Sequence, residues 1–230
     1  MNESLQTVYT AGSGVALQQR NRVLRNTYWL LALSLVPTVL GAWVGVTTGV
    51  MTQMGVGMSA IIFLAGAFGF IFAIEKTKDS AAGVGVLLAF TFFMGLMLSR
   101  LLGAVLGFRN GSTLIMTAFG GTAGVFLAMA MLATVIKRDL TNMGKFLFVG
   151  AVMLLAAGII NIFVQSTALM LTIAVVAIGV FSAFLLYDLK RIIDGGETNY
   201  VSATLALYLD LYNIFQSLLA LLGFAGGDRE

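Results

Sequence analysis

The chain has 230 residues, of which 59% are hydrophobic and only 10% are charged, and its mean hydropathy is +0.98. Soluble domains carry about 25% charged residues, so this composition indicates an integral membrane protein, and the net charge of +3 does not suggest a nucleic-acid-binding surface. The absence of cysteine and histidine excludes disulfides, thiol catalysis and ordinary zinc or copper sites.

The two ends of the chain are more polar than its middle. The first 26 residues contain Arg20, Arg22 and Arg25 and lack the apolar core of a cleavable signal peptide. We therefore expect residues 1–26 to form a polar cytoplasmic tail. Residues 225–230 are expected to form a short C-terminal tail.

Residues 27–224 contain seven apolar segments, each long enough to cross about 30 Å of hydrocarbon. They are Thr27–Thr47, Val56–Ile74, Ala81–Leu101, Thr113–Ile136, Phe146–Val164, Ala168–Tyr187 and Val201–Phe224. Alternating polar and apolar strands are scarce, which favours helices over an outer-membrane barrel. The sequence therefore predicts an all-α polytopic membrane protein with seven transmembrane helices.

Basic residues predict the orientation of these helices. With a cytoplasmic N-terminus, ten lysines and arginines lie on the inner side and three, Arg100, Arg109 and Arg229, lie on the outer side, with Arg100 and Arg109 in one outer loop. The positive-inside rule then predicts a cytoplasmic N-terminus and a periplasmic C-terminus.

Glycines at short spacings predict places where helix backbones approach closely. The clusters are Gly66 with Gly69, Gly103 with Gly107, and Gly120 with Gly121 and Gly124. Packing within the bundle and a dimer interface are both compatible with them, so the oligomeric state stays open.

Asp210 lies in the middle of the last apolar segment. An aspartate at the centre of a membrane helix costs about 3 kcal/mol on insertion scales, and such residues usually have a function. Asp210, Asn213 and Ser217 follow a spacing that places them on one helix face, so we expect this stripe to face the bundle interior and to line a pathway. The alternative is a structural hydrogen-bonding role for Asp210.

Asp188 is the candidate partner of Asp210. It lies 22 residues upstream, and a turn near Gly196 would leave the two acids at depths that differ by about 9 Å. Helix tilt, or a flat stretch at Glu197–Tyr200, would have to absorb this difference. If they meet, the two carboxyl groups would share a proton, titrate as a unit and hold Ca²⁺ only weakly. The alternative is an interfacial Asp188 paired with a nearby base.

Other polar side chains are weaker candidates. Asn161 and Gln165, one turn apart, could line an outer vestibule, although such amides more often tie helices together. A possible cytoplasmic gate comprises Glu75, Lys76, Lys78 and Arg191. No hydrolase triad, phosphate loop or metalloprotease motif is present, and the Gly-x-Gly-Asp motif of intramembrane aspartyl proteases is missing. We therefore expect no enzyme and no cofactor beyond weakly bound Ca²⁺.

The last 50 residues resemble the Bax inhibitor-1 family. The resemblance lies in Tyr187-Asp-Leu-Lys-Arg-Ile-Ile193, in Leu207-Tyr-Leu-Asp-Leu-Tyr-Asn-Ile-Phe215 and in the closing Leu-Leu-Gly-Phe224. Val23–Tyr28 and Gly195–Tyr200 resemble more particularly the proteobacterial inner-membrane branch, known as a modulator of the FtsH membrane protease.

This resemblance implies seven helices with the last one at the centre. It also implies a pH-sensitive calcium leak in which Asp188 and Asp210 form the sensor. In some members an arginine on helix two contacts that pair. Val56–Ile74 contains no arginine, and Lys76 or Lys78 at the helix end are the candidates to replace it.

Two functions follow as hypotheses. The first is a leak for calcium ions, gated by protons, in the bacterial inner membrane. The second is a non-transporting partner of an FtsH-type protease, which would grip the polar tail up to Gln19.

Overall fold

The computed structural model describes residues 3–226, with side chains described for residues 18–226. This part of the chain folds into eight helices: α1 (Glu3–Thr48), α2 (Val50–Gln53), α3 (Val56–Thr77), α4 (Ala81–Leu106), α5 (Gly111–Val135), α6 (Met143–Val164), α7 (Thr167–Ile193) and α8 (Tyr200–Gly226). In the described residues, seven helices are long and apolar enough to cross a membrane: α1 from Gln18 onward and α3 to α8. The predicted all-α polytopic fold with seven spans is confirmed.

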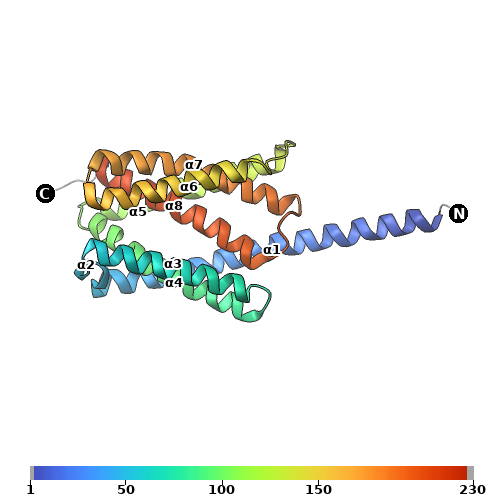
Figure 1. Ribbon diagram of the computed structural model, residues 1–230, viewed down its shortest axis with the longest axis horizontal. Coiled ribbons are helices and arrows are strands. Elements are labelled where there is room, and N and C mark those ends of the chain that lie inside the picture. Colours follow the sequence, from blue (N-terminus) through green and yellow to red (C-terminus); the bar gives the residue numbers. More distant parts are fainter. Residues whose placement is uncertain (1–2, 227–230) are drawn as a thin grey trace.

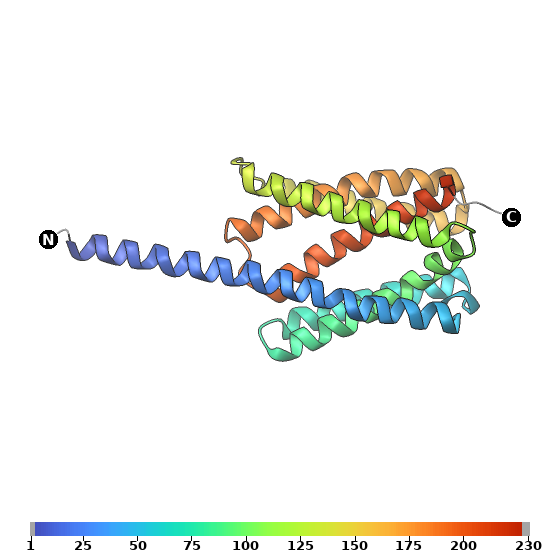
Figure 2. The same cartoon turned by 180° about the vertical axis from the view of Figure 1, so that it is seen from behind.

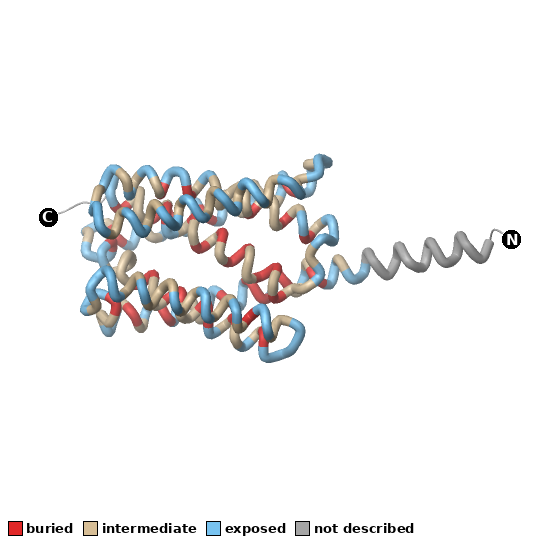
Figure 3. Tube along the Cα trace, viewed as in Figure 1, coloured by how far each residue is buried: buried red, intermediate tan, exposed pale blue. Residues whose placement is uncertain are grey.

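The last helix lies at the centre of the bundle. It packs against α1, α3, α4, α5 and α7, and it crosses the molecule obliquely, from the side of α1 toward the side of α5 and α7 (Figures 1 and 2). By contrast, α6 packs mainly against α7 and contains no buried residue (Figure 3). The predicted central position of the last helix is therefore confirmed.

Small residues let α1 and α4 pack with their backbones in contact. On α1 they are Ser34, Thr38, Gly41 and Gly45, and on α4 they are Thr91, Gly95 and Ser99. A methyl group on Gly41 would lie 3.0 Å from the Leu96 nitrogen and closer still to the Phe92 carbonyl oxygen. Close approach through small residues is the usual way in which membrane helices gain packing energy.

Only some of the predicted glycines lie in close contact with a neighbouring helix, and there they meet its side chains. Gly66 lies against the ring of Phe93, and Gly121 lies 3.2 Å, measured from an added Cβ, from a methyl group of Leu218. At Gly69, Gly103, Gly120 and Gly124, however, an added Cβ would meet nothing within 4 Å. The prediction that these four bring helices of one chain together is wrong, because their faces point away from the neighbouring helices.

Arg100 does not lie in an outer loop, as its charge led us to predict. It belongs to α4, which continues through it to Leu106. Its Nη1 donates hydrogen bonds to the carbonyl oxygens of Met51 at 3.1 Å and Met54 at 3.0 Å. Carbonyl groups at the end of a helix have no hydrogen-bond donor within that helix. The carbonyls at the end of the short helix α2 can therefore accept from Arg100, although this charged side chain lies in an apolar segment.

Candidate functional site

Asp188 on α7 and Asp210 on α8 meet inside the bundle. Their carboxyl groups lie within hydrogen-bonding reach of each other. Asp210 is 4% exposed, and among the described residues its buried Oδ2 accepts no hydrogen bond from a backbone or side-chain donor. A hydrogen bond between two carboxyl groups requires that one of them carries a proton. Two carboxyl groups so placed can hold one proton between them.

The inclination of α8 brings the two acids together. Asp188 lies five residues before Ile193, where α7 ends, and Asp210 lies ten residues after Tyr200, where α8 begins. At 1.5 Å per residue, these separations correspond to about 7.5 Å and 15 Å along the helix axes. The six-residue connection 194–199 and the oblique course of α8 absorb the difference (Figure 1).

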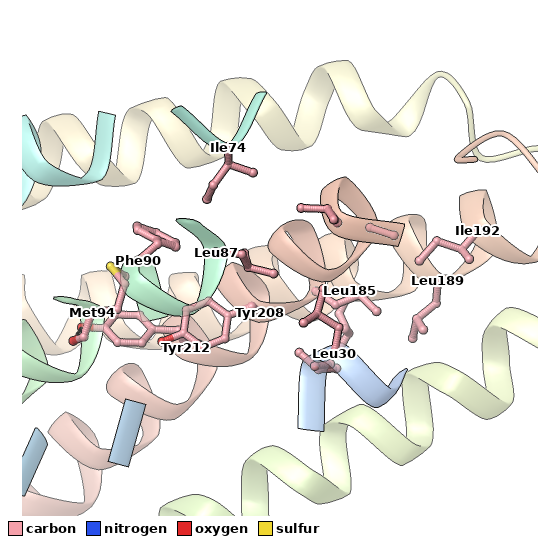
Figure 4. Close-up of a cluster of buried hydrophobic side chains, with 14 of the residues drawn as sticks. Leu30, Ile74, Leu87, Phe90, Met94, Leu185, Leu189, Ile192, Tyr208 and Tyr212 are labelled. Carbon is pink, nitrogen blue, oxygen red and sulfur yellow. Dashed lines mark hydrogen bonds between the residues drawn. The ribbon is translucent and has the colours of Figure 1, made fainter. Parts of the chain in front are cut away.

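Apolar side chains enclose the acid pair along both helices. Leu185 and Leu189 on α7 and Leu207 and Ile214 on α8 are all 0% exposed. The first two flank Asp188, and the other two lie one turn on either side of Asp210. Figure 4 shows Leu185 and Leu189 in one apolar cluster with Leu30 of α1. Asp210 is only 4% exposed whereas Asp188 is half-buried, so the enclosure is tighter around Asp210 than around Asp188.

Two charged groups lie near the pair at the end of α7, which is the cytoplasmic side in the predicted orientation. The Arg191 guanidinium and the Glu197 carboxylate both influence Asp188. These two side chains form an ion pair with an Nη2–Oε2 distance of 3.1 Å. Asp188 itself is half-buried, so it lies between the enclosed Asp210 and this charged end of α7.

The opposite face of α8 carries a set of hydroxyl groups that sequence reasoning missed. The Tyr208 hydroxyl lies 2.9 Å from Oγ1 of Thr38 on α1 and donates to the Thr91 carbonyl of α4 at 3.4 Å. The Tyr212 hydroxyl donates to the Met94 carbonyl at 3.3 Å. Figure 4 shows both rings beside Met94 and Phe90. Thr204, Tyr208 and Tyr212 recur every four residues, a spacing that could have revealed this second polar face.

The remaining polar residues of the predicted stripe are placed differently. Nδ2 of Asn213 donates to the Leu209 carbonyl of its own helix at 2.7 Å, and Ser217 is buried. Asn161 and Gln165 lie at the other end of the bundle, Asn161 in the last turn of α6 and Gln165 directly after that helix. There Oδ1 of Asn161 accepts from the Ser166 nitrogen at 3.0 Å, and Gln165 is exposed. Their role in a pathway stays a prediction.

The predicted cytoplasmic gate residues form local contacts. Lys78 pairs with Glu75, and Nζ of Lys76 lies 5.5 Å from the centre of the Phe72 ring. Arg191 pairs with Glu197, as described above. Sequence reasoning overlooked Asn199, whose side chain links the connection between α7 and α8 to the turn between α3 and α4.

The acid pair offers few ligands for a resident metal ion. Within residues 3–226, no group of three or more acidic side chains is placed to hold one. Ca²⁺ prefers six to eight oxygen ligands. A cation at this pair would therefore bind weakly and would fit the description of cargo better than that of a cofactor.

Comparison with known proteins identifies the family. Residues 20–227 match the family described as "Inhibitor of apoptosis-promoting Bax1", the Bax inhibitor-1 family. This chain belongs to that family. The match extends over all seven spans, and the resemblance noted in the last 50 residues is confirmed.

Curated relatives cover most of the chain. An "Uncharacterized membrane protein" of Vibrio cholerae is 39% identical over 89% of this chain and 90% of its own length. "Modulator of FtsH protease YccA" of Escherichia coli strain K12 is 38% identical over 93% of this chain and 94% of its own length. The same values hold for "Inner membrane protein YccA" of Escherichia coli O6:H1.

The arginine that the family resemblance implies on helix two has no counterpart in α3. Lys76 and Lys78, the candidates to replace it, are engaged with Phe72 and Glu75 at the end of that helix. In this Bax inhibitor-1 protein, the basic group that acts on Asp188 is Arg191 of the same helix, α7.

Proposed function

We propose that this protein is a pH-sensitive leak for calcium or similar cations across the bacterial inner membrane, gated by Asp188 and Asp210. The observation that carries the proposal is the contact between these two carboxyl groups inside a transmembrane bundle. Intramembrane acids in contact are expensive to keep and usually mark ion or proton pathways. The family membership supports the same reading.

The shared proton is the basis of the proposed gate. While the pair holds a proton, a hydrogen bond joins α7 to α8 and the enclosing leucines exclude water. When the proton leaves, two negative charges face each other in a medium of low dielectric, where their repulsion is much stronger than in water. Either the helices separate or a cation enters between the carboxylates. Both outcomes open a path for cations.

The proposed orientation places the N-terminus in the cytoplasm and the C-terminus in the periplasm. Ten basic residues at the α1 end of the bundle, against three elsewhere, support it. The name of the Escherichia coli O6:H1 relative supports an inner-membrane location. With this orientation, Arg191 and Glu197 lie between the cytoplasm and the acid pair.

Calcium flux into liposomes as a function of pH tests the leak. We expect Asp210→Asn to abolish the pH dependence, because an amide cannot lose a proton in this range. The matched control is Asp194→Asn, which removes an acid that pairs with Lys190 at 2.8 Å at the exposed end of α7. This control should keep the pH dependence. If flux through Asp210→Asn equals wild-type flux at every pH, the proposal fails.

A second candidate function is a non-enzymatic modulator of an FtsH-type protease. The relative from Escherichia coli strain K12 carries that name and is 38% identical. Helix α1 begins at Glu3, while its membrane-length part begins at Gln18, and its N-terminal part extends beyond the other helices (Figure 1). This extension offers a protease a segment to hold.

Co-purification with the protease tests this second function. Full-length protein should retain the protease, and a variant lacking residues 1–19 should lose it. Asp210→Asn should retain the protease as the wild type does, because the acid pair is enclosed in the bundle. If full-length protein does not retain the protease, this candidate is removed, and the leak hypothesis is unaffected.

A further inference from the structure

The connection between α7 and α8 is held by Glu197 against the end of α7. Oε1 of Glu197 accepts hydrogen bonds from the backbone nitrogens of Thr198 at 3.0 Å and Asn199 at 2.9 Å. Oε2 pairs with Arg191 at 3.1 Å. This carboxylate therefore fixes the path of the chain from the last turn of α7 to Asn199.

Asn199 joins two parts of the protein that lie 120 residues apart in sequence. Its Oδ1 accepts from the backbone nitrogens of Val201 at 2.9 Å and Ser202 at 3.1 Å, which caps the first turn of α8. Its Nδ2 donates to Oδ1 of Asp79 at 2.8 Å and to the Lys78 carbonyl at 3.1 Å. One side chain thus ties the start of α8 to the turn between α3 and α4.

This tie holds the N-terminus of α8 against the turn between α3 and α4. The oblique course of that helix, as shown above, compensates for the unequal depths of the two acids along α7 and α8. A shift of the N-terminus of α8 away from the α3–α4 turn would change its inclination, and Asp210 would move relative to Asp188. We propose that Asn199 is a positioning residue, which sets the placement of Asp210 against Asp188 through its hydrogen bonds to the α3–α4 turn.

The inference deepens the proposed leak and rests on it for its functional meaning. The charged groups around the pair belong to several elements. Arg191 and Glu197 act on Asp188. Glu75, Lys76 and Lys78 lie at the end of α3. Arg25 on α1 and Lys137 after α5 are exposed. Because Asp79 carries a charge itself, the test must separate a change of charge from a loss of hydrogen bonds.

Three variants make that separation. Asn199→Asp keeps an oxygen to cap α8 but loses both donor bonds and sets a carboxylate against Asp79. Asp79→Asn removes the charge and keeps the oxygen that accepts from Asn199. The double variant restores a hydrogen bond between the two positions with the donor and acceptor exchanged. Slow amide exchange at Val201 and Ser202 in all three variants confirms that the cap of α8 is intact.

The protonation of the acid pair is measured by infrared spectroscopy as a function of pH. The band to follow is that of a protonated carboxyl group, and it is assigned to the pair by its loss in Asp210→Asn. One hydrogen bond changes an equilibrium by about 2- to 10-fold, so Asn199→Asp should displace the midpoint of this band by about 0.3 to 1 pH unit. In liposomes the same variant should raise calcium flux at neutral pH by about 2- to 10-fold, since it weakens the closed arrangement. Asp79→Asn should resemble the wild type, and the double variant should return most of the way to it.

The outcomes separate this inference from the proposed leak. An unchanged midpoint in Asn199→Asp overturns the positioning role. A midpoint displaced in the opposite direction in Asp79→Asn also overturns it, because a charge effect would then explain both single variants. So does a double variant that does not return toward the wild type, since its exchanged hydrogen bond would then have no effect. A wild-type protein without a titrating carboxyl band also overturns it, since no pair would exist to be positioned. If the wild type conducts no calcium but the midpoints follow the expected pattern, the leak fails and the positioning role stands.

Discussion

Replacing Gly95 of α4 by alanine should destabilise the bundle, because this glycine touches the backbone of α1. A Cβ at this position would lie 2.9 Å from the Ala42 nitrogen and 2.9 Å from the Thr38 carbonyl carbon, and closer still to the Thr38 carbonyl oxygen. Ordinary contacts begin at 3.4 Å. Backbone atoms cannot rotate away as a side chain can, so the two helices must separate by at least about half an ångström. Such a gap already forfeits about a quarter of the dispersion energy of each affected contact.

The expected cost is about 1 to 3 kcal/mol, the usual range for overpacking a well-packed interior. Alanine is the better helix former by about 1 kcal/mol, so a control must contain the same gain. Gly85→Ala on the same helix is that control, since an added Cβ at Gly85 meets nothing within 4 Å. Relative to Gly85→Ala, Gly95→Ala should therefore be less stable by about 1 to 3 kcal/mol.

Unfolding of the detergent-solubilised protein by denaturant or heat measures this difference. The midpoints of the two variants should fall on opposite sides of the wild type, with Gly95→Ala below it. If Gly95→Ala proves as stable as Gly85→Ala, then the α1–α4 interface is not in backbone contact, and the reasoning from small residues is refuted.

Two further predictions concern the ends of the bundle. Arg100→Met removes two hydrogen bonds from a charged donor and should lower the free energy of unfolding by about 1 to 3 kcal/mol. Amide hydrogen exchange at Val50–Gln53 should accelerate in this variant, whereas Arg109→Met should leave it unchanged. Equal exchange in both variants would contradict the role of Arg100. In the turn after α5, hydrogen bonds from the Thr141 hydroxyl at 2.5 Å and nitrogen at 2.8 Å lower the pKa of the Asp139 carboxyl. These bonds stabilise the turn above the usual aspartate pKa of about 4 and lose that effect as the pH falls through the lowered value. Carboxyl titration by NMR should show the Asp139 pKa rising in Thr141→Val, and identical titrations would disprove it.

The sequence predicted the spans well because hydrocarbon thickness constrains them. Seven apolar segments became seven long helices, and the turn expected near Gly196 lies between α7, which ends at Ile193, and α8, which begins at Tyr200. Arg100 was misplaced, since composition cannot show that a charge inside an apolar segment finds backbone carbonyls on another element.

Contacts between distant segments were the part that pattern alone could not supply. The meeting of Asp188 and Asp210 depends on the inclination of α8, which is set by Asn199 and by packing against α1 and α4 rather than by any local propensity. The same limit explains the glycines. Sequence spacing identifies helix faces made of small residues, but the positions of the neighbouring helices decide which of these faces another helix packs against. Another helix packs against Gly41 and Gly95, and none in the described part of the chain packs against Gly120 and Gly124.

The polar contacts of α8 are distributed unequally between its two faces. On one face, Tyr208 and Tyr212 bind α1 and α4, and Asn199 binds the α3–α4 turn, so α8 belongs to a unit with the tightly packed α1 and α4. On the other face, the carboxyl groups of Asp188 on α7 and Asp210 on α8 lie within hydrogen-bonding reach of each other. In the proposed gate, loss of the shared proton removes this contact and leaves only side-chain packing between α7 and α8, while the bonds of α8 to α1 and α4 persist. A pH-driven opening should therefore separate α7 from α8 and leave the interface of α8 with α1 and α4 unchanged.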